Sequence, residues 1–159
     1  LGIENNVSNT LVLACAKLGI NIVIAAPEID AASVDEELNE MAEETGLVSR
    51  TLDMENALRG ADYVHDDTWL NKEFFEGGNV KPEYLEEYKR RKSSLAPYQL
   101  NASLINKYAP NAKIMHCMPC HVGYEISRDA LNHPNSIIFD QAENRLHMQK
   151  AIIVWLLKN

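Results

Sequence analysis

Two groups of reactive side chains lie near the end of the sequence. The first reads His116-Cys117-Met118-Pro119-Cys120-His121, and the second reads Asp140-Gln141-Ala142-Glu143-Asn144-Arg145. Each follows a short apolar run, at 112–115 and 136–139. A thiol or carboxylate can exchange protons and hydrogen bonds with a substrate, and an arginine at a helix start can bind an oxyanion or phosphate. These residue types therefore predict a site for a polar substrate beside an anion.

Two further polar groups, Asn5-Asn6 and Asp66-Asp67, also follow predicted strands. Each group has a simpler explanation when taken alone. The asparagines can cap a helix, the paired aspartates can form a solvated turn, and Asp140 and Glu143 can complement a helix dipole. Arg145 alone can be ordinary solvated surface. All four groups, however, fall at one predicted edge of a sheet, where open α/β folds bind ligands. This convergence favours a shared site.

The stretch Cys117-Met118-Pro119-Cys120-His121 also matches the Cys-x-x-Cys-His motif of covalent haem attachment, and its first four residues match a redox Cys-x-x-Cys. Haem attachment would require export and a mostly helical fold. A redox motif should open a helix, whereas Pro119 and Gly123 predict a loop. Zinc would have to be held by His116, Cys117, Cys120 and His121, which are crowded for a tetrahedral site. We therefore expect no metal ion and no cofactor, with these three alternatives open to test.

The predicted elements alternate between short strands and longer helices. Strands are expected at 21–26, 47–52, 62–65, 112–115 and 136–139, and helices include 7–18, 83–94 and 144–157. This alternation is typical of right-handed βαβ units. The predicted fold is α/β, with a mostly parallel, Rossmann-like sheet between two layers of helices. We expect one domain covering residues 1–159.

Composition narrows the functional classes. The chain has 159 residues, a formal net charge of -8 and 46% hydrophobic residues. An acidic chain without a basic patch is not expected to bind nucleic acid, and no apolar run is long enough to predict a membrane span. Three cysteines do not form a disulfide framework, so a cytoplasmic location is expected. The abrupt start at Leu1-Gly2-Ile3 suggests a piece of a longer protein.

The polar groups, in their order along the chain, resemble the motifs of the aspartate/ornithine carbamoyltransferase family, and its ornithine-using members most closely. The matching segments are Asn5-Asn6, Asp67-Thr68-Trp69, His116-Cys117-Met118-Pro119 and Glu143-Asn144-Arg145. The resemblance covers almost the whole chain. It implies the second, amino-acid-binding domain of a two-domain enzyme. The Ser-x-Arg-Thr loop of the first domain, which binds carbamoyl phosphate, does not occur here.

The resemblance also implies roles for individual residues. Cys117 and Asp67 would bind and help deprotonate the side-chain amine of ornithine, while Asn6 and Asp67 would hold its α-amino and carboxylate groups. The carbamoyl group would meet Arg145 and the backbone of Cys117 and Met118, with His116 also part of the substrate site. The product would be citrulline. In this family the enzyme is a homotrimer, and the helix over 144–157 packs on the first domain.

One loop departs from the family pattern. Ornithine enzymes follow Asp-x-Trp with a Ser-Met-Gly loop, and this chain has Leu70-Asn71-Lys72-Glu73 there. Asn71 could replace the serine hydrogen bond, whereas Lys72 would change the charge of the pocket. The acceptor could therefore be ornithine or a similar amine, including putrescine or an N-acylated ornithine. A non-catalytic binding module of the same fold is the remaining alternative.

Overall fold

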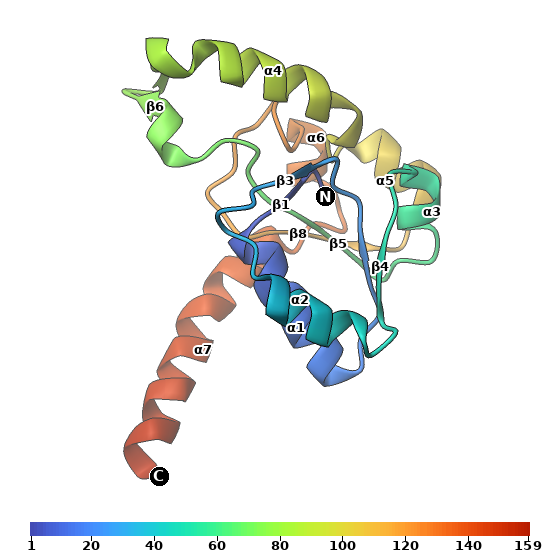
Figure 1. Cartoon of the computed structure of the whole chain (residues 1–159), viewed down its shortest axis with the longest axis vertical. Coiled ribbons are helices and arrows are strands. Elements are labelled where there is room, and N and C mark those ends of the chain that lie inside the picture. The colour runs from blue at the N-terminus through green and yellow to red at the C-terminus, as the bar shows by residue number, and fades with distance from the viewer.

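The computed structural model describes residues 1–159, and three parallel strand pairs lie around the centre of the molecule (Figure 1). The parallel pairs are β1 (Ile3–Glu4) with β3 (Glu28–Ile29), β2 (Ile22–Ile24) with β4 (Val48–Arg50), and β5 (Tyr63–Asp66) with β8 (Lys113–His116). Parallel pairs require crossover connections, and the intervening helices supply them. The predicted parallel α/β fold is confirmed.

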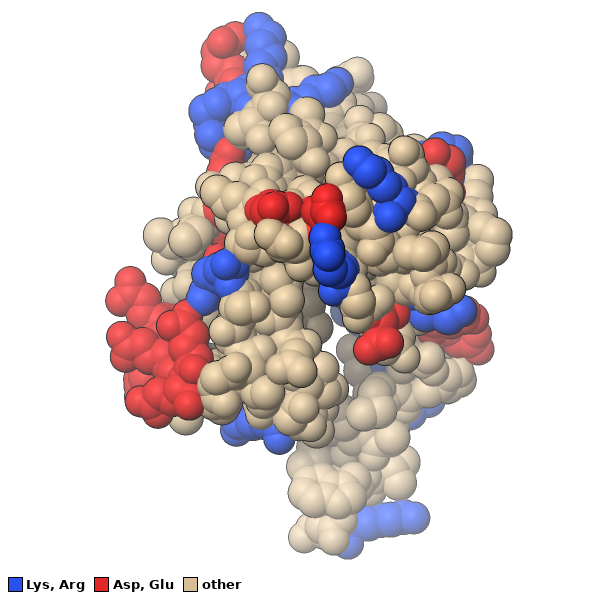
Figure 2. Space-filling model, turned by 90° about the vertical axis from the view of Figure 1, so that its right-hand side faces the viewer, with Lys and Arg blue, Asp and Glu red and all other residues tan.

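Helices lie on both sides of these strands, and the last helix extends away from the rest of the molecule (Figure 1). The α-helices are α1 (Asn6–Leu18), α2 (Glu36–Glu43), α3 (Met54–Leu58), α4 (Leu85–Leu95), α5 (Ala102–Tyr108), α6 (Arg128–Leu131) and α7 (Ile138–Lys158). None of them combines the length and the apolar character that crossing a bilayer requires. Acidic side chains cluster on one part of the face shown in Figure 2, while lysines and arginines are spread over it.

Residues 71–84, between β5 and α4, contain short regular elements. They are the 3₁₀ turns η1 (Lys72–Phe74) and η2 (Pro82–Tyr84), and an antiparallel hairpin of β6 (Phe75–Glu76) and β7 (Asn79–Val80). A third 3₁₀ turn, η3 (Ala96–Tyr98), follows α4. Gly77 and Gly78 both have positive φ and form the hairpin turn, which glycine adopts without a steric penalty.

The predicted strand at 136–139 is wrong. Only Ser136 pairs with Ile114, in an isolated parallel bridge, and α7 already begins at Ile138 rather than at Asn144. Periodicity cannot separate a short apolar strand from the first turn of a buried helix, which explains the error. Arg145 therefore lies well inside α7 and does not belong to a helix N-terminus.

The buried apolar residues fall into three clusters. The largest cluster has 11 buried residues and joins α3, β5, α5, β8 and α6, with Leu58, Val64, Ile105 and Ile114 among its members. The smallest contains Val12, Ile24 and Ala42, from α1, β2 and α2. A third cluster around Trp69, Leu70, Phe74 and Leu95 fixes the segment after β5. The clusters hold the carboxyl ends of β5 and β8 next to each other.

Candidate functional site

Asp67 is the centre of the polar site at the carboxyl end of β5. Its carboxylate accepts hydrogen bonds from Asn5 Nδ2 and from Cys117 Sγ, each at 2.7 Å. The backbone N–H of Thr68 donates to Oδ1 at 2.7 Å. The three side chains come from the start of α1, the end of β5 and the end of β8. The structure therefore brings together three of the four polar groups that the sequence predicted to converge.

The Cys117 thiol is a hydrogen-bond donor in this arrangement. Burial and the neighbouring Asp67 carboxylate together raise the pKa of Cys117 well above that of a free thiol. Both causes disfavour the thiolate, because one removes solvation and the other adds a like charge. The group able to accept a hydrogen bond from a substrate amine is consequently the Asp67 carboxylate. From residue types alone, the thiolate and the carboxylate are equally able to take this role.

His116 shapes the loop that follows β8. Its Nδ1 accepts a hydrogen bond of 2.9 Å from the backbone N–H of Met118, which has a positive φ of 54°. Its own backbone N–H donates to Gln141 Oε1 at 2.9 Å. The side chain is fully buried, with Nε2 3.6 Å from Glu125 Oε1. His116 thus holds the loop in place from within the protein, and the N–H of Met118 is already occupied.

Two carboxyl groups beside the site are buried, although Asp66 was expected only as part of a polar pair and Glu125 was not expected at the site. Asp66 and Glu125 have no exposed surface, and neither Asp66 oxygen has a hydrogen-bond partner. Burial raises the pKa of Asp66 well above that of a free aspartate, and nearby Glu125 acts in the same direction. Asp66 lies two residues after Val64 in β5, so both side chains point to the same buried face of the strand. This period of two could have indicated that Asp66 is buried.

Arg145 does not contact Asp67 or Cys117. Its side chain is exposed on α7 and takes part in no hydrogen bond or ion pair. Gln141 lies four residues earlier and contacts the backbone of His116, with its Nε2 3.4 Å from His65 Nε2. Residues four apart share one face of a helix. Arg145 therefore extends from the helix face that borders the ends of β5 and β8, one turn beyond Gln141.

The other three predicted substrate-binding residues lie apart from the centre of the site. Asn6, Asn71 and Lys72 are exposed, and none of their side chains contacts Asp67 or Cys117. Asn5, not Asn6, reaches Asp67, and it also caps α1 by accepting hydrogen bonds from the N–H groups of Val7 and Ser8. A helix-capping asparagine directly after a strand was visible in the sequence, but only its structural role was recognised.

The β6–β7 hairpin is attached to the loop that carries the site. The rings of Phe75 and His121 are stacked with centroids 4.6 Å apart. His121 lies four residues beyond Cys117, so this contact connects the segment after Asp67 to the segment after β8. Lys72 and Asn71 precede the hairpin and remain on its solvent side.

The metal alternatives of the sequence analysis have no matching geometry. No group of three or more histidine, cysteine, aspartate or glutamate side chains is placed to hold an ion together. Cys117 and Cys120 are both free thiols. The Cys-x-x-Cys-His motif therefore does not gather a ligand set, because its residues separate along an irregular loop.

The fold and site define a parallel α/β domain with a carboxylate-centred polar site at its strand ends. Over residues 1–156 the chain matches the family model described as "Aspartate/ornithine carbamoyltransferase, Asp/Orn binding domain", and it belongs to that family. It is 37% identical over 160 residues to an ornithine carbamoyltransferase of Brucella abortus, which covers 100% of this chain and 47% of that protein. The chain spans about half the length of the curated relatives it matches.

Two other relatives agree with this assignment. An ornithine carbamoyltransferase of Methanothermobacter thermautotrophicus is 38% identical over 161 residues, covering 99% of this chain and 50% of that protein. The solved structure of ornithine carbamoyltransferase from Pyrococcus furiosus superposes with a TM-score of 0.76 at 31% identity. That match covers 95% of this chain and 47% of the Pyrococcus chain. The resemblance found from the sequence motifs is thereby confirmed.

Proposed function

We propose that this chain is the amino-acid-binding half of an enzyme that transfers the carbamoyl group of carbamoyl phosphate to the side-chain amine of ornithine. Citrulline and phosphate would be the products. The observation that carries the proposal is the Asp67 carboxylate, held at the strand ends by hydrogen bonds from Asn5 and Cys117. The printed names of the relatives support ornithine as the acceptor.

Carbamoyl transfer requires an uncharged amine next to an activated carbonyl carbon. The Asp67 carboxylate suits the first requirement, because it can attract an ammonium group and accept a proton or hydrogen bond from it. The Cys117 thiol supports Asp67 by donating to Oδ1, which leaves other lone pairs of the carboxylate free for substrate. Much of the rate would come from holding the two substrates at reacting distance.

The carbamoyl donor is anionic, and Arg145 is the cation we assign to it. Arg145 has no intramolecular partner and extends from the α7 face on which Gln141 contacts His116. Arginine can bind phosphate or carbonyl oxygens with two parallel hydrogen bonds. Within the same proposal, His116 and the backbone of Met118 shape the loop next to the reacting groups, and Asn6, Asn71 and Lys72 contact the amino-acid end of the substrate from the rim.

The intact enzyme would need further parts. We propose that carbamoyl phosphate binds mainly through a first domain, that the active enzyme is a homotrimer, and that residues 1–159 alone are inactive. The exposed apolar side chains near the end of α7, such as Ile153, Trp155 and Leu157, support a packing partner for this helix. The free cysteines are compatible with a cytoplasmic enzyme.

The direct test is citrulline formation by the full-length enzyme with ornithine, putrescine and N-acetylornithine as competing acceptors. Ornithine should give the highest kcat/KM. Changing Asp67→Asn should lower kcat/KM for ornithine by roughly 10²–10⁴-fold, the usual range for a lost acid–base group. Asp62→Asn is the matched control, since Asp62 is an exposed aspartate at the opposite end of β5. Transfer to none of the three amines would refute the proposal.

A further inference from the structure

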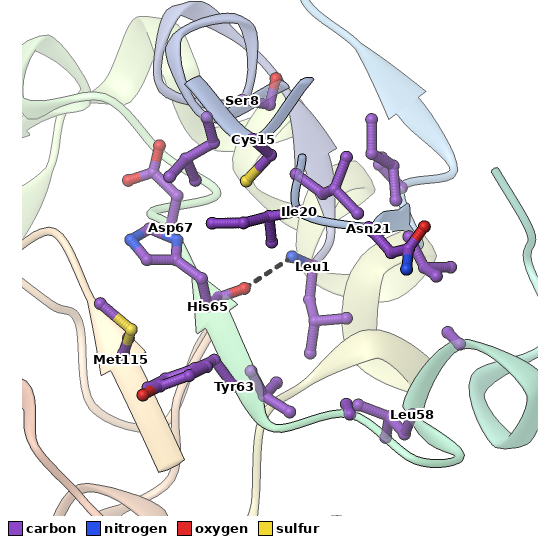
Figure 3. A pocket seen from close by; sticks show the side chains of 18 of the residues that line it. Leu1, Ser8, Cys15, Ile20, Asn21, Leu58, Tyr63, His65, Asp67 and Met115 are labelled. Atoms are coloured by element: carbon purple, nitrogen blue, oxygen red, sulfur yellow. Dashed lines mark hydrogen bonds between the residues drawn. The ribbon is translucent and has the colours of Figure 1, made fainter. Parts of the chain in front are cut away.

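The ends of β5 and β8 carry different side chains on their two faces. On one face, His65 and Met115, with Asp67 directly after β5, line a mainly apolar cleft of about 670 Å³ (Figure 3). Asp66 and His116 occupy the alternate positions and point to the other face, where they are opposite each other in the β5–β8 register. Both side chains are fully buried. A polar cluster therefore lies inside the protein, directly behind the residues that the substrate would contact.

Glu125 completes this buried cluster from the loop that follows β8. Its Oε1 accepts a hydrogen bond from the backbone N–H of His121 and lies 3.6 Å from His116 Nε2 and 3.8 Å from His121 Nδ1. Its own carbonyl oxygen accepts a hydrogen bond of 2.8 Å from Leu100 N–H. Backbone contacts thus hold Glu125 in place, with its carboxyl group directed at two imidazole rings.

The position of the ring proton on His116 follows from its contacts. Nδ1 accepts the N–H of Met118 at 2.9 Å, and a ring nitrogen that accepts a hydrogen bond carries no proton. The proton of the neutral ring therefore lies on Nε2, the nitrogen that faces Glu125 Oε1. A carboxylate beside one ring nitrogen fixes both the tautomer and the orientation of a histidine that must present its other nitrogen.

The remaining ionisable groups leave Glu125 as the charged member of the cluster. Neither oxygen of Asp66 has a hydrogen-bond partner, whereas Glu125 Oε1 accepts one and faces two further nitrogens. Burial and the nearby Glu125 raise the pKa of Asp66, so this aspartate keeps its proton. The pKa of His65, the other imidazole near His116, is lowered to about 4, mainly by burial. At neutral pH the cluster then combines neutral side chains with one carboxylate.

The hydrogen bond to His116 sets the direction of the peptide between Cys117 and Met118. In a trans peptide the carbonyl points opposite to the N–H. Because the Met118 N–H points inward to His116, the Cys117 carbonyl points away from the buried cluster, and it accepts no hydrogen bond within the chain. Met118 has a φ of 54°, which a residue other than glycine keeps only where surrounding contacts hold it. The bond to His116 is such a contact.

We propose that Glu125 is a positioning residue: it keeps the proton of His116 on Nε2, so that Nδ1 holds the Cys117–Met118 peptide in the orientation used for carbamoyl transfer. The effect on rate rests on the proposed function, whereas the pairing of Glu125 with His116 is a property of residues 1–159 and can be measured without any substrate. Glu125 touches no substrate in this role and acts only through His116.

The first measurement is the tautomer of His116 in residues 1–159, from the ring ¹⁵N chemical shifts of histidine-labelled protein. Protonated and unprotonated ring nitrogens have widely different shifts, and a His116→Asn variant identifies the signals by their loss. The unmodified chain should show an unprotonated Nδ1 and a protonated Nε2. Glu125→Gln should show the same state, because its oxygen can still accept from the His121 N–H and from Nε2–H.

Glu125→Leu removes the acceptor, so the His116 signals should shift toward values averaged over both tautomers. A protonated Nδ1 in the unmodified chain would overturn the proposal, and this result does not depend on whether the leucine variant folds. An unchanged tautomer in a folded Glu125→Leu protein would overturn it as well.

The second measurement is citrulline formation by the full-length enzyme. Glu125→Leu should lower kcat by roughly 10²-fold, the effect of misplacing a reacting group by about 1 Å. The KM for ornithine should change little, because Asp67 keeps its hydrogen bonds from Asn5 and Cys117. Glu125→Gln should retain most of kcat. Glu37→Leu, at an exposed glutamate of α2, is the control and should change neither quantity.

The two measurements separate failure of this inference from failure of the proposed function. Equal losses of kcat in Glu125→Gln and Glu125→Leu would overturn the positioning role while leaving carbamoyl transfer intact. If the unmodified enzyme formed no citrulline, the proposed function would fail and the effect on rate with it, and the tautomer of His116 would still decide whether Glu125 controls this ring.

Discussion

The Cys117 thiol donates a hydrogen bond of 2.7 Å to Asp67 Oδ1 across a sequence separation of 50 residues. The contact is made possible by the parallel pairing of β5 and β8, which places Asp66 opposite His116 and brings the next residue of each strand together at the sheet edge. The same bond determines the protonation of the pair. A protonated sulfur next to an ionised carboxylate is a stable arrangement, whereas two adjacent anions are not.

The first prediction concerns the reactivity of Cys117. Asp67→Asn removes the negative charge that disfavours the thiolate, so the pKa of Cys117 should fall and its alkylation by iodoacetamide at pH 8 should accelerate, by about tenfold for each unit of pKa. Peptide-resolved mass spectrometry would measure the rate. Cys15, whose pKa is raised by burial alone, is the internal reference. A Cys117 rate that did not change relative to Cys15 would contradict the assigned hydrogen bond.

The second prediction concerns pH and Asp66. Because burial raises the pKa of Asp66 in the folded protein, the folded state is most stable when this carboxyl group is protonated. Its contribution to stability is complete below the pKa of an unfolded aspartate, about 3.9, and is lost as the pH rises through the folded pKa. The charged groups that act on Asp66 are Glu125, Asp67 and the amino group of Leu1.

Asp66→Asn should therefore increase the free energy of unfolding at pH 8 more than at pH 4. Urea denaturation at the two pH values would measure the difference, with Asp62→Asn as the exposed control. The control should shift stability by no more than about 0.5 kcal/mol at either pH. An equal effect of Asp66→Asn at both values would mean that folded Asp66 titrates as it does in the unfolded chain.

The third prediction separates the two roles of Asn5. Asn5→Ser retains a capping oxygen for the N–H groups of Val7 and Ser8 but removes the Nδ2 bond to Asp67. Asn5→Ala removes both. The alanine variant should be less stable than the serine variant by about 0.5–2 kcal/mol, the usual value of a helix N-cap. In the full-length enzyme both variants should have a lower kcat/KM for ornithine, because both remove the hydrogen bond that holds Asp67 Oδ2 in place.

Urea denaturation of the isolated chain and citrulline assays of the full-length enzyme would give the two quantities. Equal activity of Asn5→Ser and the unmodified enzyme would restrict Asn5 to capping. Equal stability of the serine and alanine variants would show that the cap contributes little, and would leave the bond to Asp67 as the sole role of this side chain.

The fourth prediction concerns Gly2, which lies against Trp69. A Cβ at position 2 would stand 2.5 Å from Trp69 Nε1, and the φ of 92° is itself unfavourable for any other residue. Gly2→Ala should destabilise the chain by more than about 2 kcal/mol, through strain and overpacking together. Gly60→Ala is the control, because Gly60 has a positive φ of 75° but no atom within 4 Å of an added Cβ. Thermal melts that gave the same Tm loss for both variants would exclude the clash with Trp69.

Much of the architecture was predictable from local sequence. Asn5, Asp53 and Asn101, which are residue types that favour helix N-caps, cap α1, α3 and α5, and the left-handed Gly19 ends α1. These signals succeed because capping depends on side chain and backbone groups only a few residues apart. The parallel pairing also followed from the alternation of strands and helices. The family assignment needed only the order of the polar motifs.

The sequence was less informative where contacts between distant residues determine the type of an element or the orientation of a side chain. The apolar run before α7 looked like a strand, yet a single paired residue was followed directly by the helix. Which of Asn5 and Asn6 contacts Asp67 could not be predicted for a similar reason, since only the orientation of α1 determines which amide faces this carboxylate. The complete burial of Asp66 and Glu125 was not predictable from composition, because acidic residues are seldom fully buried.

The separation of the α1–α2 cluster from the large α3–α5–α6 cluster affects how the domain unfolds. The α1–α2 cluster has three buried members and the α3–α5–α6 cluster has eleven, and a largely open cleft lies between them. Few contacts couple the unfolding of the two clusters. Denaturation of residues 1–159 should therefore proceed in two steps, with α1 and α2 unfolding first. The smaller half would then sample open states while β5 and β8 still hold Asp67 and Cys117 within bonding distance.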